Sequence, residues 1–204
     1  MGQWMKINGE SIYGTQASPF KHLSWGRCTQ KVVKGGTRLY LHVFSWPESG
    51  RLVIPGIYNQ PGQAFLLSDP TIKLDAFRKE DAIVINVPPK VPDPINSVVA
   101  IDIVGKPDVN DPPVISAEYD IFIDEMDVSI VSPRENITIR YTLDGSTPDT
   151  KSPIVNGPIR LKNTAQVSAR IFRNGTPVSG SIQAKYTKVV PRPDVDLPNI
   201  TQGL

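Results

Sequence analysis

From residue 25 onward, apolar and polar side chains alternate along the chain with a period of two. Leu39, Leu41 and Val43 alternate with more polar neighbours, a pattern typical of a strand that buries one face. The segment 34–37 before them contains two glycines and indicates a hairpin turn. Short apolar runs bounded by Gly, Pro, Asn or Asp predict further strands at 51–54, 64–67, 72–74, 82–87 and 98–104. Strands with this spacing predict a β-sandwich.

A proline-rich segment at 107–113 separates this region from a second one. Its three prolines fix φ and remove backbone N–H donors, so a central strand cannot pass through it. Beyond it the alternation resumes and closes on Asp144-Gly145, and two more strands are expected at 167–172 and 182–186. The apolar positions of the resumed alternation are Ile137, Ile139, Tyr141 and Leu143. We therefore predict an all-β protein of two antiparallel β-sandwich domains.

The predicted division of the chain has four parts. Residues 20–106 and 107–190 are the two sandwiches, and 191–204 is a linker or the start of a further module. Residues 1–19 differ from the rest because their apolar side chains are spaced three to five apart, and Asn8-Gly9 interrupts the pattern as a helix end would. These side chains are Trp4, Ile7, Ile12 and Tyr13. We interpret the segment as the tail of a helix that packs on a part of the protein upstream of residue 1.

Composition narrows the function classes. The 22 basic and 20 acidic residues are scattered without runs, which disfavours a nucleic-acid partner. Apolar stretches of ~20 residues are lacking, so no membrane helix is expected, and the N-terminus does not have the layout of a signal peptide. The single cysteine, Cys28, excludes an internal disulfide, and with only two histidines beside it no metal site or cofactor is expected.

Two stretches resemble known families. Residues 3–15, QWMKINGESIYGT, closely resemble the W-x-x-x-N-G-E-[AS]-I-Y-x-T signature that closes the catalytic barrel in family 29 α-L-fucosidases. Segments 18–20, 25–29 and 39–47 then look like the start of that family's C-terminal β-sandwich. Region 114–190 is similar to the immunoglobulin-like domain appended to chitobiases and hexosaminidases, on the following residues: IRYTLDGSTP at 139–148, GPI at 157–159, VSAR at 167–170 and Phe172.

The resemblance implies a secreted bacterial parent enzyme, periplasmic or extracellular, whose barrel removes terminal α-L-fucose with retention. Residues 1–19 would be the remnant of the last helix of that TIM-like barrel, and Trp4, Ile7, Ile12 and Tyr13 would contact the barrel. Retaining chemistry needs two carboxyl groups ~5–5.5 Å apart at the mouth of a barrel. This sequence has no β/α alternation that could build one, so we assign no catalytic residue to it.

For several polar clusters, a structural role is the favoured alternative to a functional one. Glu10, inside the fucosidase-like signature, is expected to satisfy backbone groups with Asn8 rather than to act as an acid or base. Oxygen-rich segment 144–149 is interpreted as a turn. An acidic cluster could supply calcium ligands but matches no loop motif, so a solvated turn is the favoured interpretation; its members are Asp120, Asp124, Glu125 and Asp127.

Two aromatic residues are candidates for sugar binding. Trp46 and Tyr58 stand at a strand end and in a loop, where an exposed ring could stack on a pyranose. Core or interdomain packing is the favoured alternative for both. The partners expected are thus the catalytic barrel of the same parent chain and, in the alternative function of a carbohydrate-binding module, fucosylated glycans. A hydrolytic or adhesion function of the chain itself has no supporting set of nucleophile, base and orienting group.

Overall fold

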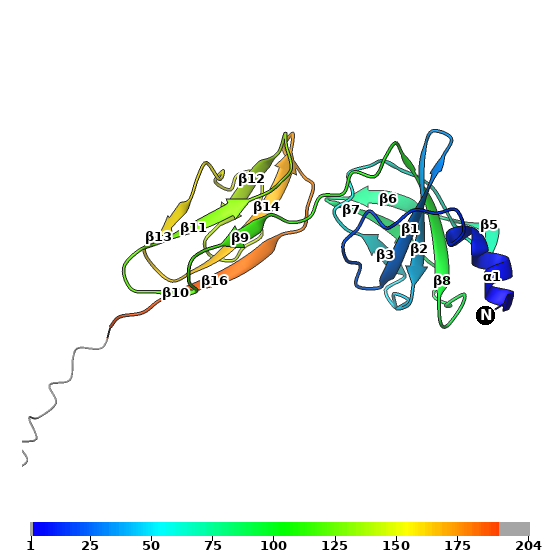
Figure 1. Ribbon diagram of the computed structural model, residues 1–204, viewed down its shortest axis with the longest axis horizontal. Helices are drawn as coiled ribbons and strands as arrows, with labels where there is room; N and C mark the ends of the chain where they lie inside the picture. The colour runs from blue at the N-terminus through cyan, green and yellow to red at the C-terminus, as the bar shows by residue number, and fades with distance from the viewer. Residues whose placement is uncertain (1, 192–204) are drawn as a thin grey trace, which may run out of the picture.

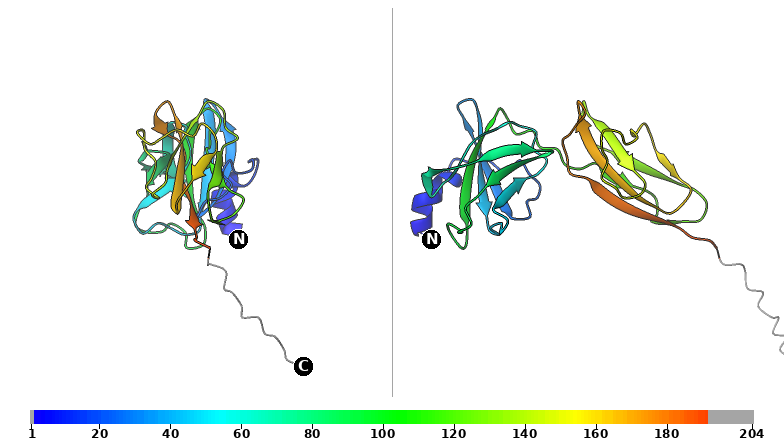
Figure 2. Two further views of the ribbon diagram at one scale, coloured as in Figure 1. Left: turned by 90° about the vertical axis from the view of Figure 1, so that its left-hand side faces the viewer. Right: turned by 180° about the vertical axis from the view of Figure 1, so that it is seen from behind.

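The computed structural model describes residues 2–191, and the all-β prediction is confirmed (Figures 1 and 2). Two β-sandwiches follow one another along the long axis, and the short N-terminal helix lies at the end of the first sandwich that is remote from the second. The predicted linker at 191–204 lies outside the described residues apart from Pro191. Within residues 2–191, no helix has the length and apolar character needed to cross a membrane.

The first sandwich consists of a five-stranded sheet and a three-stranded sheet. The larger sheet has the order β1-β2-β8-β4-β5, in which every neighbouring pair is antiparallel. Its strands are β1 (Gly26–Val33), β2 (Gly36–Val43), β4 (Pro61–Leu66), β5 (Asp69–Leu74) and β8 (Ser97–Val104). The smaller sheet has the order β3-β7-β6, with β3 (Arg51–Ile54), β6 (Ala76–Lys79) and β7 (Ala82–Asn86). Strand β6 was not predicted, because its four residues include two charges and offer little alternation.

The turn predicted at 34–37 joins β1 to β2. Val33 pairs with Gly36 across the hairpin, and Gly35 between them has a φ of 86°. That φ lies in the left-handed region, which glycine adopts at no steric cost.

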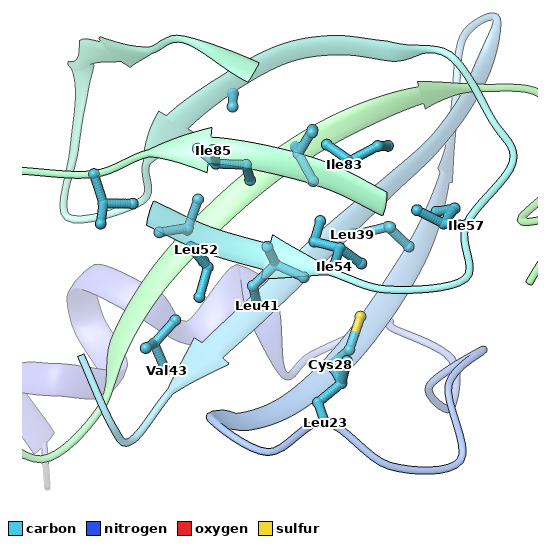
Figure 3. Packing of buried hydrophobic residues seen from close by; sticks show 14 of the residues in the cluster. Leu23, Cys28, Leu39, Leu41, Val43, Leu52, Ile54, Ile57, Ile83 and Ile85 are labelled. Atoms are coloured by element: carbon cyan, nitrogen blue, oxygen red, sulfur yellow. The ribbon is translucent and has the colours of Figure 1, made fainter. Parts of the chain in front are cut away.

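The apolar side chains of the alternating strands meet between these two sheets (Figure 3). Leu39 and Leu41 of β2 are fully buried there, opposite Leu52 of β3 and Ile83 and Ile85 of β7. Each such side chain contributes about 1.5–3 kcal/mol when it leaves water. Cys28 lies in the same cluster, so it is a buried apolar side chain of the core, as is usual for free cysteine.

The second sandwich packs a five-stranded sheet against a three-stranded one. The order of the larger sheet is β10-β16-β14-β12, with β15 also paired to β14, and that of the smaller is β13-β11-β9. The strands are β9 (Val114–Ser116), β10 (Ile121–Phe122), β11 (Met126–Val131), β12 (Thr138–Thr142), β13 (Ile159–Leu161), β14 (Ala165–Arg173), β15 (Thr176–Pro177) and β16 (Ile182–Lys188). β10 pairs with β16 in parallel, an exception to the antiparallel prediction. Ile139 and Tyr141 of β12 pack on the core as expected, whereas Leu143 lies beyond the end of the strand and is exposed.

The proline-rich segment between the sandwiches is attached to the first of them. The Asn110 N–H donates to the Gly56 carbonyl (2.7 Å) and the Tyr58 N–H to the Asp108 carbonyl (2.8 Å). The side chain of Asn59 adds three hydrogen bonds: its amide donates to the carbonyls of residues 104 and 106, and its oxygen accepts from the Asp108 N–H. The prolines therefore flank a short stretch that pairs with the first sandwich beyond the boundary predicted at 106.

Candidate functional site

The N-terminal segment is fastened to the outer face of the five-stranded sheet. It comprises α1 (Gly2–Asn8) and the 3-10 helix η1 (Gly9–Ser11). The indole of Trp4 packs on a small apolar cluster of that face and donates from Nε1 to the carbonyl of Asn96 (2.9 Å). The cluster consists of Tyr40, Phe65, Leu67, Val98 and Ala100. Trp4 therefore contacts its own sandwich, and a contact of Trp4 with a barrel stays a prediction.

Glu10 is a second point of attachment. The Tyr40 hydroxyl donates to Glu10 Oε1 at 2.6 Å, and Arg38 Nη1 lies 3.5 Å from the same oxygen. Arg38 is itself held by a bidentate pair with Asp102, at 2.7 and 3.0 Å. Burial of the phenol, together with its bond to Glu10, raises the pKa of Tyr40. The expected backbone role of Glu10 is thus wrong: its carboxylate binds side chains of β2, while the amide of Asn8 does donate to a backbone carbonyl, that of Trp4.

A buried polar cluster fills the space beneath the segment. The Thr29 hydroxyl donates to the Ser11 carbonyl at 2.6 Å. His42 is buried, with Nε2 3.4 Å from the Thr29 hydroxyl and Nδ1 3.4 Å from the amide nitrogen of Asn96. Burial lowers the pKa of His42, so the ring is neutral at neutral pH. The amide oxygens of Asn8 and Asn96 have no hydrogen-bond partner among the described residues.

The segment also presents apolar side chains to solvent. Ile7, Ile12 and Tyr13 are all exposed, and Tyr13 is the most exposed of the three. We call these three residues the N-terminal apolar surface. Of the four side chains predicted to contact a barrel, the structure thus turns Trp4 inward onto the sandwich and leaves the other three open.

The two aromatic candidates for sugar binding have packing partners. Trp46 packs against the first core and donates from Nε1 to the carbonyl of Pro88 (2.9 Å). The ring of Tyr58 carries two guanidinium groups, those of Arg78 and Arg173, at 5.6 and 4.8 Å from its centroid. Neither ring is an open platform, and sugar binding at either stays a prediction.

The acidic segments form turns and surface ion pairs. Asp144 accepts from the N–H and the hydroxyl of Ser146, as expected of a turn. Within the acidic cluster, Asp127 forms a bidentate pair with Arg160, and Glu125 pairs with Arg160 and Lys162. Among residues 2–191, no group of three His, Cys, Asp or Glu side chains is arranged to hold a metal ion.

Charged side chains join the two sandwiches, and sequence reasoning missed them. Arg170 of β14 donates to Asp81 (2.6 Å) and Glu80 (3.1 Å), which form the tip of the β6–β7 hairpin. Its Nε also donates to the carbonyl of Ser179 (2.8 Å). Nearby, Arg173 pairs with Asp108 of the connecting segment at 2.6 Å. These partners are far apart in sequence, so no local signal could have found their pairing.

Comparison with known families gives one match. Residues 121–183 match the family model described as the chitobiase/beta-hexosaminidase C-terminal domain. This confirms the resemblance seen in region 114–190. A comparison with curated protein sequences finds no match.

Solved structures of fucosidases are among the structural matches. A bacterial fucosidase with a monovalent iminocyclitol inhibitor is 24% identical, with a TM-score of 0.43, over 51% of this chain and 23% of that one. A covalent intermediate of the family 29 α-L-fucosidase of Bacteroides thetaiotaomicron is 24% identical, with a TM-score of 0.42, over 50% and 23%. The α-L-fucosidase of Vibrio sp. strain EJY3 is 20% identical, with a TM-score of 0.47, over 91% and 37%.

The chain therefore spans less than two fifths of the length of each of these fucosidases. Within its second sandwich, residues 121–183 are similar to the C-terminal domain of chitobiases and β-hexosaminidases.

Proposed function

We propose that this chain is the non-catalytic C-terminal portion of a secreted α-L-fucosidase, in which it stabilises and positions a catalytic barrel. The observation that carries the proposal is the N-terminal apolar surface on a segment that is itself fixed to the sandwich. The fucosidase-like signature at 3–15 and the chitobiase-type match at 121–183 supply the enzyme class.

The attachment of the segment explains how positioning would work. Its contacts reach β1 through Thr29, β2 through Tyr40, and the loop before β8 through Asn96. A segment attached at three places cannot move relative to the sheet without breaking these partly buried hydrogen bonds. A barrel that covers Ile7, Ile12 and Tyr13 would therefore be held in one orientation on the sandwich.

The location of the surface fits this role. In Figures 1 and 2, α1 lies at the end of the first sandwich opposite the second sandwich. A barrel docked on α1 would leave the second sandwich free of contact with it. Burial of apolar side chains stabilises a complex by about 0.8 kcal/mol for each CH₂ group, so covering the N-terminal apolar surface would favour docking of the barrel.

The test has two stages. The reading frame upstream of residue 1 should encode a βα-repeating barrel, and its absence would refute the proposal. The barrel is then produced separately and mixed with this chain, and association is measured by sedimentation. We expect a complex whose melting temperature exceeds that of the barrel alone.

A matched pair of variants locates the contact. Replacing Ile7, Ile12 and Tyr13 together by serine should abolish association. The control replaces Val104, Ile95 and Tyr119, which are also exposed but lie on other elements, and should leave association intact. Equal effects of the two triple variants would remove the N-terminal apolar surface from the proposal.

A further inference from the structure

The outer face of the three-stranded sheet carries an apolar row that is open to solvent at two of its three side chains. The register aligns Val53 of β3 with Val84 of β7, and Val84 with Phe77 of β6. Ile54, Ile83 and Ile85 of the same strands point into the core, so alternation directs this row away from it. Val53 and Phe77 are partly exposed on either side of the buried Val84.

Charged side chains of both signs border the row. Arg51 lies at one end, in register with Asn86, and Lys79 lies at the other, in register with Ala82. Glu80 and Asp81, at the tip of the β6–β7 hairpin, complete the rim. Together with Ser49 these residues enclose an open hollow of about 510 Å³. Among the described residues, neither Arg51 nor Lys79 has an ion-pair partner within 4.0 Å.

The second sandwich holds the acidic side of the rim in place. Arg170 binds one oxygen of each carboxylate, Asp81 Oδ1 and Glu80 Oε2. Glu80 has a φ of 52°, a left-handed conformation that a non-glycine residue keeps only when its surroundings enforce it. The second oxygen of each carboxylate makes no hydrogen bond to another described residue and is free to accept one. The hydrogen-bond acceptors are thus fixed before any ligand arrives, which lowers the entropic cost of binding.

We infer that this hollow binds a neutral pyranose, with the apolar C–H face of the sugar on the exposed side chains of Val53 and Phe77. A sugar ring combines one apolar face with hydroxyls that both donate and accept. Those hydroxyls would accept from Arg51 and Lys79 and donate to Glu80 and Asp81. An anion would meet the two carboxylates and a cation the two free cations, so an uncharged polyol fits the mixed rim best.

The size and place of the hollow agree with this ligand. Ligand pockets of about 300–1,000 Å³ that combine an apolar floor with a few fixed polar groups are found preferentially at domain boundaries. The hollow borders the second sandwich through Arg170. The inference goes beyond the proposed barrel-positioning role and concerns a surface separate from the N-terminal apolar surface.

The test is a titration of the ¹⁵N-labelled chain with three uncharged methyl glycosides, those of L-fucose, D-galactose and N-acetylglucosamine. At least one should shift the amide signals of β3, β6 and β7. Phe77→Ala should weaken that binding by at least about tenfold. Phe44→Ala is the matched control, because Phe44 is 53% exposed against 37% for Phe77 and does not line the hollow.

Arg51→Met and Lys79→Met keep the bulk of each side chain and test the rim without disturbing the row. Each should weaken binding measurably while the spectrum of the free chain stays folded. The inference is overturned if none of the three glycosides shifts these strands at about 50 mM, a concentration far above typical millimolar dissociation constants. The methyl glycoside of galacturonic acid, which carries a free carboxylate, is titrated as the anionic comparison. Shifts produced by this anion alone, or equal losses in Phe77→Ala and Phe44→Ala, would overturn the inference as well. Because the chain is tested alone, the outcome is independent of whether a barrel binds it.

Discussion

Replacing Arg170 with methionine is expected to destabilise the junction between the sandwiches by about 3 kcal/mol. The Arg170 side chain is only 9% exposed and that of Asp81 15%, so the ion pair between them is largely shielded from water. Removing one partner of a buried pair costs about 3–5 kcal/mol, because the other charge stays buried without compensation. Glu80 is well exposed and regains water when the arginine is lost, which places the expected cost at the lower end.

Urea unfolding followed by circular dichroism measures this cost. Arg160→Met is the matched control: Arg160 also forms a bidentate pair, with Asp127, but the two side chains are 61% and 51% exposed. An ion pair that is exposed to water contributes little to stability, so Arg160→Met should leave the urea midpoint nearly unchanged. Adding Asp81→Asn to Arg170→Met should recover part of the loss, because it removes the stranded charge. The reasoning fails if Arg170→Met costs no more than Arg160→Met.

Three further predictions concern the first sandwich. Gly26→Ala should lower the free energy of unfolding in urea by at least about 4 kcal/mol, because the added Cβ would lie 1.8 Å from the carbonyl oxygen of His42. Gly35→Ala is the control: its Cβ would meet open space, and its φ of 86° should cost only about 1–2 kcal/mol, so equal costs would contradict the steric argument. Burial lowers the pKa of His42 below its ordinary 6.5, so the unfolded state binds the proton first and stability should fall as the pH drops below 6.5, by at most about 1.4 kcal/mol per pH unit. The loss of stability should level off once the pH is below the pKa of His42 in the folded state, and His42→Gln should remove this part of the pH dependence. Burial raises the pKa of Cys28 to about 12, so a thiol reagent at pH 8 should label it only after urea unfolding, and rapid labelling of the native chain would contradict its place in the core.

The sandwiches were predictable because alternation and turn chemistry are local signals. Leu39, Leu41 and Val43 point inward as their period requires, and Gly35 supplies the left-handed turn that the sequence indicated. Strand β6 escaped prediction because Phe77 is the one large apolar side chain within it, and that side chain faces outward rather than into the core.

The surfaces were less predictable because they depend on pairs distant in sequence. In the sequence, Trp4 has no evident partner. In the structure, the loop before β8 brings the carbonyl of Asn96 within hydrogen-bond distance of its indole. Tyr58 reads as an open aromatic residue until the second sandwich places Arg173 over it. A carboxylate such as that of Glu10 can accept hydrogen bonds from many kinds of donor. Its partner, here the Tyr40 hydroxyl, is therefore known only from the tertiary structure.

The way residues 108–110 pair with 56–58 decides where the chain can be divided for separate expression. A first half that stops before Pro107 would expose the backbone of the 56–58 loop and leave the side-chain oxygen of Asn59 without its donor, the Asp108 N–H. A first half that runs through Pro112 keeps those bonds and loses the hydrogen bonds and ion pairs to the second half, such as that between Asp108 and Arg173. By its hydrogen bonds, the segment that links the two sandwiches is therefore part of the first sandwich.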